Sequence, residues 1–234
     1  MHKFRLSFAI MAAAVFCSAF APAVKAATDG PHASTGGIPA ATTDWVSSLT
    51  FPTFDPTLGT LNSVKLLFTS SYETTITVNN TSPDPSSGSA KTEIQFVVQD
   101  PGNNLVGSFI PPDPGPPTLD LYSPAFSYSL AGGGSTTSGL LANSGGDSNS
   151  YTLAAILAEF TGTGGSMTLS AATFTQTVVA NTGGNTAASQ VSDASLDGTV
   201  TYFYTPVPEP STVVLLGFGA VSMLVCGRRR LRSA

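Results

Sequence analysis

Few side chains in this 234-residue chain have the chemistry of a catalytic nucleophile, base or metal ligand, and the two Cys and two His are the scarcest. Cys17 and His2 lie in an apolar N-terminal segment, and Cys226 lies in an apolar C-terminal one. His32 is therefore the one imidazole of the central region, in a segment expected to be flexible. Because this region has no Cys and one His, the sequence excludes thiol chemistry, disulfides and His-based metal clusters there. A serine hydrolase is disfavoured, because His32 is the one candidate base and no Gly-x-Ser-x-Gly elbow is present.

Carboxylates are the remaining acid–base groups. A glycosidase needs two of them at a fixed separation, but acidic residues on solvated faces also keep a lysine-poor protein soluble. We favour the second interpretation. Oxygen-rich turns at residues 147–149 and 193–198 lack the Asp-x-Asp-x-Asp-Gly pattern of a calcium loop. The sequence therefore predicts no catalytic residue, no metal site and no cofactor. The carboxylates considered are Glu73, Asp84, Glu93, Asp100, Asp113, Asp120, Asp147 and Glu159.

Aromatic side chains offer a different chemistry, because exposed rings beside polar groups can stack on sugars. Tyr122 and Tyr128 are expected to share one strand face, as are Tyr202 and Tyr204. Such a pair is more often core or rim than a sugar platform, so carbohydrate binding stands as the alternative function. The candidate rings are Trp45, Tyr72, Tyr122, Tyr128, Tyr151, Tyr202 and Tyr204.

Charge is partitioned along the chain. Between Ala27 and Thr205 only Lys65 and Lys91 oppose thirteen carboxylates, a net charge of −11, whereas the other seven basic residues lie near the ends. Nucleic-acid binding requires a positive surface that displaces counterions from phosphates. The acidic central region predicts no nucleic-acid partner.

The first 26 residues have the three-part form of a secretory signal. Lys3 and Arg5 precede an apolar run over residues 6–20, and residues 23–26 place small side chains at a cleavage site. The apolar run is shorter than the ~20 residues of a spanning helix. We expect export through the Sec translocon, removal by signal peptidase between Ala26 and Ala27, and a flexible leader over residues 27–42.

The C-terminal tail has three successive parts. The prolines around Pro208-Glu209-Pro210 disfavour helix and sheet and predict an extended, accessible segment. The apolar stretch that follows has a helical length of roughly 25 Å, at the lower limit for crossing a membrane, and an arginine cluster then fixes the C-terminus on the cytoplasmic side. The predicted transmembrane residues are Val213, Val214, Leu215, Leu216, Gly217, Phe218, Gly219, Ala220, Val221, Ser222, Met223, Leu224, Val225 and Cys226, and the basic cluster is Arg228, Arg229, Arg230 and Arg232.

This order of Pro-Glu-Pro, short apolar helix and arginine cluster resembles the PEP-CTERM sorting signal of Gram-negative bacteria. The alternative is an ordinary single-pass anchor after a proline-rich stalk. The resemblance implies that an exosortase, a membrane-embedded sorting enzyme, recognises residues 206–234 and removes the helix. It also implies an inner-membrane precursor that then reaches the cell surface or the extracellular space, with its exopolysaccharide.

The elements between the tails are short strands separated by turns. Alternating residues such as Ile94, Phe96 and Val98 have the period of two that is typical of half-buried strands. The pattern predicts an all-β fold, a single jelly-roll-like β-sandwich over residues 43–205, with a short helix as the alternative at 153–160. The expected strands are 61–70, 73–79, 92–100, 118–130, 150–160, 166–180 and 191–204, and the expected mobile loops are 82–90, 111–117, 132–150 and 182–189.

Residues 54–64, followed by the alternating stretch that ends at residues 77–81, resemble the opening of choice-of-anchor domains of type E. A generic strand–turn–strand unit is the alternative. The first function predicted is thus an exported structural or adhesive protein associated with exopolysaccharide. The alternatives are a carbohydrate-binding module and a surface polysaccharide hydrolase.

Overall fold

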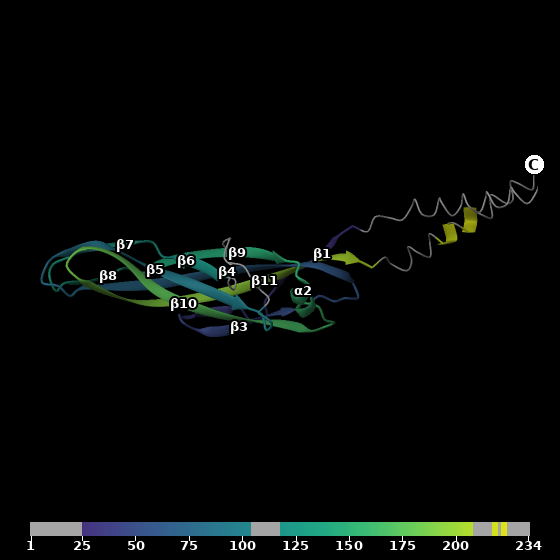
Figure 1. Ribbon diagram of the computed structural model, residues 1–234, viewed down its shortest axis with the longest axis horizontal. Helices are drawn as coiled ribbons and strands as arrows, with labels where there is room; N and C mark the ends of the chain where they lie inside the picture. Colours follow the sequence, from purple (N-terminus) through teal and green to yellow (C-terminus); the bar gives the residue numbers. More distant parts are fainter. Residues whose placement is uncertain (1–24, 104–117, 208–216, 220, 224–234) are drawn as a thin grey trace, which may run out of the picture. The chain divides into compact units, whose positions relative to one another are not determined.

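A computed structural model describes residues 25–103, 118–207, 217–219 and 221–223 of the chain. Eleven strands and a short helix make up the folded part (Figure 1). The elements are β1 (Ala27–Ala33), β2 (Ile38–Thr42), β3 (Val46–Pro52), β4 (Gly59–Asn80), β5 (Ser86–Gln99), β6 (Thr118–Tyr122), β7 (Phe126–Leu130), β8 (Ser135–Thr137), β9 (Leu141–Tyr151), α2 (Ala154–Glu159), β10 (Ser166–Gly183) and β11 (Thr186–Pro206).

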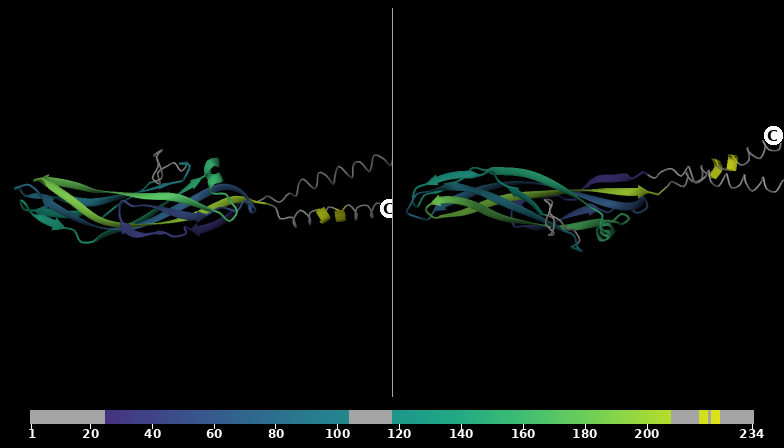
Figure 2. Two further views of the ribbon diagram at one scale, coloured as in Figure 1. Left: turned by 90° about the horizontal axis from the view of Figure 1, so that it is seen from below. Right: turned by 45° about the horizontal axis from the view of Figure 1, so that its top comes forward.

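The strands form two antiparallel sheets, which confirms the predicted all-β sandwich. Sheet A has six strands in the order β1-β11-β4-β8, with β2 also paired to β11 and β9 to β4. Sheet B has five strands in the order β3-β10-β5-β6, with β7 also paired to β5. The chain changes sheet at the β4–β5 and β10–β11 turns, so the four longest strands run back to back in the two layers (Figures 1 and 2).

Alternation along the long strands explains why two layers form. In β4, Val64, Leu66 and Phe68 are buried, whereas Lys65 and Leu67 between them and Thr69 after them are exposed. Successive side chains of a strand point to opposite faces, so each long strand has one apolar and one polar face. Packing the two apolar faces together removes them from water, which is the main stabilising contribution to the fold.

A belt of buried hydroxyl groups divides the interior into two apolar clusters. Along β4, Tyr72 belongs to the larger cluster and Ile76 to the smaller one, and Thr74 lies between them. The Thr74 hydroxyl oxygen lies 3.1 Å from that of Thr92 in sheet B and 2.7 Å from that of Ser192 in sheet A. Because each hydroxyl has a partner, the belt joins the two sheets without leaving an unsatisfied buried group.

Residues 27–42, expected to be a flexible leader, instead form β1 and β2, which both pair with β11. Ile38 reaches the larger core cluster, being only 7 % exposed. Residues of low apolar content thus gain order because β11 supplies a hydrogen-bonding edge. The first strand begins at Ala27 and the sandwich unit begins at residue 28, both ahead of the expected boundary at residue 43.

Several expected loops are also strand. Residues 86–90 belong to β5, residues 135–137 and 141–150 to β8 and β9, and the stretch 182–189 is strand apart from a turn at Gly184 and Asn185. The expected loop 111–117 lies outside the described residues. Residues 61–79 form one continuous strand, and the stretch 150–160 contains α2, as the helical alternative predicted.

The chain divides into two compact units. The sandwich unit comprises residues 28–56 and 61–204, and the second unit comprises residues 1–27, 57–60 and 205–234. Within the second unit the backbone N–H of Val207 donates to the carbonyl oxygen of Leu58 at 3.1 Å. Among the residues that the structure describes, none of the helices has the length and apolar character needed to span a membrane.

Candidate functional site

The residues predicted to direct sorting fall almost entirely outside the described ranges. Pro208, Glu209, Pro210 and the arginine cluster are among those outside, as are most of the predicted transmembrane residues. Residues 217–219 and 221–223 are helical. The described chain leads into this region through β11, which ends at Pro206, two residues before Pro208.

Most of the aromatic candidates serve the core. Tyr72, Tyr128, Tyr151 and Tyr202 are buried, and Trp45 and Tyr204 pack against the larger core cluster. Burial raises the pKa of Tyr72 and Tyr151 to about 12. Burial also raises the pKa of Tyr202 above its usual value. Six of the seven rings are therefore not platforms for a ligand.

The two predicted face-sharing pairs have different outcomes. Tyr202 and Tyr204 do share a face of β11, and that face is core, because both rings pack on Phe54 with centroid separations of 5.7 and 5.1 Å. The prediction for Tyr122 and Tyr128 is wrong. These residues lie on different strands, β6 and β7, and Tyr122 is exposed while Tyr128 is buried.

Two aromatic rings of the described sandwich remain exposed, and both lie on the outer face of sheet B. Tyr122 in β6 is 42 % exposed and Phe174 in β10 is 57 % exposed. Phe174 did not enter the sequence-based candidates. Its signal was available in the period of β10, because Met167, Leu169 and Ala171 are buried and position 174 is out of phase with them.

The two rings lie on either side of β5, whose outward side chains are polar. Across the three strands, the register aligns Gln176, Glu93 and Tyr122 in one row. Phe174, Gln95 and Asp120 form the adjacent row. The Tyr122 hydroxyl donates to Glu93 Oε1 at 2.8 Å, and the Gln176 amide donates to Glu93 Oε2 at 2.6 Å. Glu93 therefore holds both neighbours in place.

The surface formed by these side chains and Lys91 is called the outer aromatic face. It consists of seven residues: Lys91, Glu93, Gln95, Asp120, Tyr122, Phe174 and Gln176.

Charges on this face are arranged around the phenol of Tyr122. The ammonium of Lys91 lies 4.2 Å from the centre of the Tyr122 ring, a cation–π contact. The hydrogen bond to Glu93, followed by burial and the charges of Glu93 and Asp120, raises the pKa of Tyr122 above its usual value. The phenol is thus uncharged at neutral pH and acts as a donor to Glu93.

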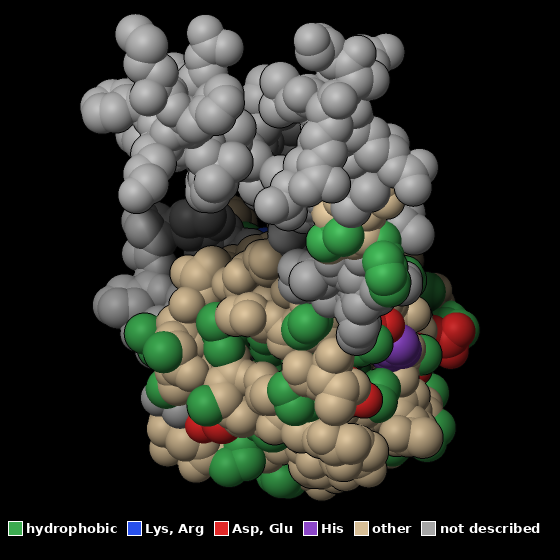
Figure 3. All heavy atoms as spheres, turned by 90° about the vertical axis from the view of Figure 1, so that its right-hand side faces the viewer, with side chains coloured by type: hydrophobic (Ala, Val, Ile, Leu, Met, Phe, Trp, Pro, Cys, Tyr) green, Lys and Arg blue, Asp and Glu red, His purple; other side chains and the backbone are tan. Residues whose placement is uncertain are grey.

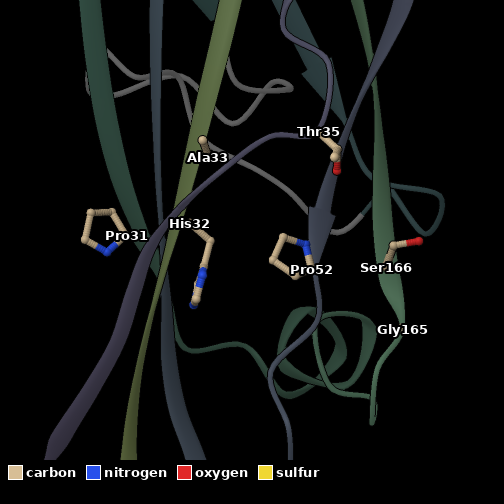
Figure 4. A pocket seen from close by; sticks show the side chains of 7 residues that line it. All are labelled: Pro31, His32, Ala33, Thr35, Pro52, Gly165 and Ser166. Atoms are coloured by element: carbon tan, nitrogen blue, oxygen red, sulfur yellow. The ribbon is translucent and has the colours of Figure 1, made fainter.

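A shallow groove elsewhere on the sandwich contains the one described histidine. Its volume is about 550 Å³, and Pro31, His32, Pro52 and Ser166 are among the residues that line it. His32 Nε2 lies 2.9 Å from Asp29 Oδ1, so the imidazole has a carboxylate partner. The Ser166 hydroxyl points away from His32 (Figure 4). The groove holds an Asp–His pair and a serine without the alignment of a nucleophile and its base.

A second hollow, of about 630 Å³, contains two carboxylates, those of Glu73 and Asp193. Both side chains are exposed, whereas the proton-holding acid of a glycosidase is kept away from water. The other predicted carboxylates are dispersed over the described part of the chain. Glu93 and Asp120 lie on the outer aromatic face, Asp84 lies in the β4–β5 turn, and Asp100 is buried after β5. Asp147 lies on β9 and Glu159 at the end of α2, whereas Asp113 lies outside the described residues.

Comparison with known proteins adds information on the C-terminal tail. Residues 206–230 match the family model of the PEP-CTERM protein-sorting motif. A search of the curated proteins finds no match. The resemblance of residues 54–64 to choice-of-anchor domains stays a prediction.

Similar solved structures are remote. The xylan-binding CBM22-1 domain of Paenibacillus barcinonensis Xyn10C is 9 % identical over 79 % of this chain and 96 % of that one, with a TM-score of 0.14. The lectin from Bauhinia forficata in complex with GalNAc is 14 % identical over 77 % and 94 %, with a TM-score of 0.13. The VP2 subviral particle of infectious bursal disease virus is 9 % identical over 88 % of this chain and 49 % of that one, with a TM-score of 0.18. This chain therefore spans about half the length of the viral protein. TM-scores this low establish neither a shared fold nor a shared function.

The family match includes the Pro-Glu-Pro segment, the apolar stretch and the first three arginines of the tail, in the order that the sequence analysis singled out. The Pro-Glu-Pro segment and the apolar stretch are the parts that a membrane-embedded sorting enzyme would recognise. The chain thus carries a PEP-CTERM sorting motif, which indicates an exported protein that is sorted by an exosortase.

Proposed function

We propose that this chain is the precursor of a non-enzymatic surface protein with a structural or adhesive role among exopolysaccharides. Signal peptidase removes residues 1–26 after export. The C-terminal helix over residues 213–226 then holds the precursor in the inner membrane, with the arginine cluster on the cytoplasmic side, until exosortase acts at Pro208-Glu209-Pro210. The product is the sandwich of residues 27 to about 206, at the cell surface or outside the cell.

One observation carries this proposal: the strands occupy the interval between the two processing signals. β1 begins at Ala27, immediately after the predicted cleavage site, and β11 ends at Pro206, just before the sorting motif. Cleavage at these two places removes no strand from either sheet. A domain that keeps every ladder hydrogen bond after both cleavages is suited to be released as a folded body.

The character of the sandwich surface supports a structural role. One end of the domain presents mostly hydrophobic and uncharged side chains, with scattered acidic groups (Figure 3). Serine and threonine hydroxyls are frequent on the exposed positions of β3, β9 and β10. Such a surface offers hydrogen bonds to a hydrated polymer and carries little positive charge that would attract nucleic acid. The geometry of the His32 groove and of the Glu73 hollow favours this role over hydrolysis.

Processing is tested by intact-mass analysis of material recovered from cell surfaces. We expect a chain that begins at Ala27 and lacks residues 213–234, and we expect cells without the exosortase to retain the C-terminal helix in their membranes. Recovery of the same full-length membrane protein from both strains would contradict the proposal.

The sorting motif itself is tested with a matched pair of variants. Replacing Pro208 and Pro210 together with alanine, or Glu209→Gln, should leave an unprocessed membrane-bound precursor. Val46→Ala is the control, because Val46 is an exposed apolar residue of β3 that lies outside the matched residues 206–230. Normal processing of the motif variants would show that these residues are not what the sorting enzyme recognises.

A further inference from the structure

We propose that the outer aromatic face binds a neutral polysaccharide chain, with Phe174 and Tyr122 stacking on two different sugar rings of one chain. This inference rests on the proposed function, since it names the polymer surface that the exported domain contacts. It assigns the contact to the outer face of β10, β5 and β6. The remaining aromatic rings of the described sandwich are buried or partly buried and take no part in this contact.

The spacing of the two rings fits an extended ligand. Phe174 and Tyr122 are separated by one intervening strand, β5, and by two residues along the strand direction. With strands roughly 4.8 Å apart and a rise of about 3.3 Å per residue, their Cα atoms are roughly 12 Å apart. One sugar ring is too short to reach both side chains. A chain of sugars laid diagonally across β5 can place one ring on each aromatic.

The polar groups between the rings are placed to bind hydroxyl groups. Glu93 already holds Tyr122 and Gln176, so these side chains lose little conformational freedom when a ligand arrives. The Gln176 amide retains a carbonyl acceptor, and the Tyr122 oxygen can still accept. Lys91 covers one side of the Tyr122 ring, so the sugar stacks on the opposite side. The diagonal path crosses β5 between Gln95 and Glu93, and Asp120 lies beside it on β6.

The chemical class of the ligand follows from composition and charge. Two rings set among amide and carboxylate groups do not form the contiguous apolar centre of a protein–protein interface. The central region carries a net charge of −11 with only two lysines, so a polyanion would be repelled. Sugars suit the face because one side of a pyranose is apolar C–H and its edge is hydroxyl. A neutral glycan is the ligand that matches both features.

The test uses the full chain, with its signal peptide processed, purified from membranes in a polyoxyethylene detergent that contains no sugar. Affinity electrophoresis measures binding to a neutral β-glucan, to galactomannan, to xylan and to the exopolysaccharide of the producing cells, with alginate as the polyanion. We expect retardation by at least one neutral polymer. Phe174→Ala and Tyr122→Ala should each weaken it roughly tenfold, which is about 1.4 kcal/mol.

Two variants separate stacking from other effects. Tyr122→Phe keeps the ring and should retain binding, whereas Val191→Ala changes an exposed apolar residue on the other sheet and should have no effect. Circular dichroism checks that each variant is folded. Absence of binding to every neutral polymer, binding to alginate alone, or undiminished binding by both alanine variants would overturn the inference. None of these results alters the masses of the processed chain, so a failure here is distinct from a failure of the proposed sorting.

Discussion

The two faces of sheet B are built from the same strands but differ in burial and in chemical character. On the inner face, Ile94 and Phe96 of β5 are at most 1 % exposed and belong to the larger core cluster. On the outer face of the same strand, Glu93 and Gln95 lie between two exposed rings. The inner face is held by shape and burial, and the outer face by a few directed hydrogen bonds. Changes on the inner face should therefore act on folding, and changes on the outer face on recognition.

The largest contrast is expected between Phe96→Ala and Phe174→Ala, which remove the same side chain from opposite faces of neighbouring strands. Phe96 packs on Trp45 with ring centroids 6.2 Å apart, and its loss leaves a cavity. We expect the free energy of unfolding to fall by about 3–5 kcal/mol for Phe96→Ala and by less than about 0.5 kcal/mol for Phe174→Ala. Urea unfolding followed by circular dichroism measures both. Equal losses would show that the outer face is part of the core.

A smaller effect is expected at the hydroxyl belt, where the inner face is polar. Thr74→Val leaves Thr92 and Ser192 without a shared partner and should lower the free energy of unfolding by about 1–3 kcal/mol. Thr77→Val is the control, because its hydroxyl contacts Thr137 on an exposed face. The same urea titration compares them. An unchanged stability for Thr74→Val would mean that the belt contributes nothing to joining the sheets.

High pH should destabilise the core of the sandwich through its buried tyrosines. Tyr151 has a pKa of about 12 in the folded chain against 10.0 when unfolded, so the folded state holds the phenol proton more tightly. The contribution is fully present below pH 10 and is lost as the pH rises toward 12. Tyr151→Phe should therefore lose about 1–2 kcal/mol less between pH 9 and 12 than the unaltered chain. Thermal unfolding at several pH values tests this, and parallel curves would contradict it.

The smallest effect is expected for Tyr122→Phe on the outer face. The variant removes the hydrogen bond to Glu93, but the side chain is 42 % exposed and water replaces the lost partner. We expect the free energy of unfolding to change by less than about 0.5 kcal/mol. A loss as large as that of Thr74→Val would show that the outer face also holds the fold together.

Local pattern predicted the two-layer fold well and the extent of its strands poorly. The period of two is visible at Ile94, Phe96 and Val98, and these residues are buried as expected. Residues 86–90 and 141–150 contain mostly small and polar residues and were expected to be loops, yet they pair with β10 and β4. A strand that lies between two others, or beside a long strand, is stabilised by hydrogen bonds to its neighbours. Its own amino-acid composition does not reveal this contribution.

The candidate site shows the same limit. Sequence reasoning included Tyr122 among seven rings, and it omitted Phe174. Which ring faces outward depends on strand register, and which outward rings are neighbours depends on the order of strands in the sheet. Tyr122 and Phe174 are 52 residues apart in the sequence and flank the same polar residues of β5 only because β6 and β10 both pair with β5.

The sequence by itself identified the PEP-CTERM sorting motif and the class of the fold. A sorting motif is a short linear segment, so its charges, length and prolines suffice to identify it, and alternating side chains suffice to predict a sandwich. Tertiary structure alone decided that the first strand begins at Ala27, that six of the candidate rings are buried in the core or pack against it, and that Phe174 joins Tyr122 on one surface. These are properties of pairing between distant strands, and no local segment encodes its partner.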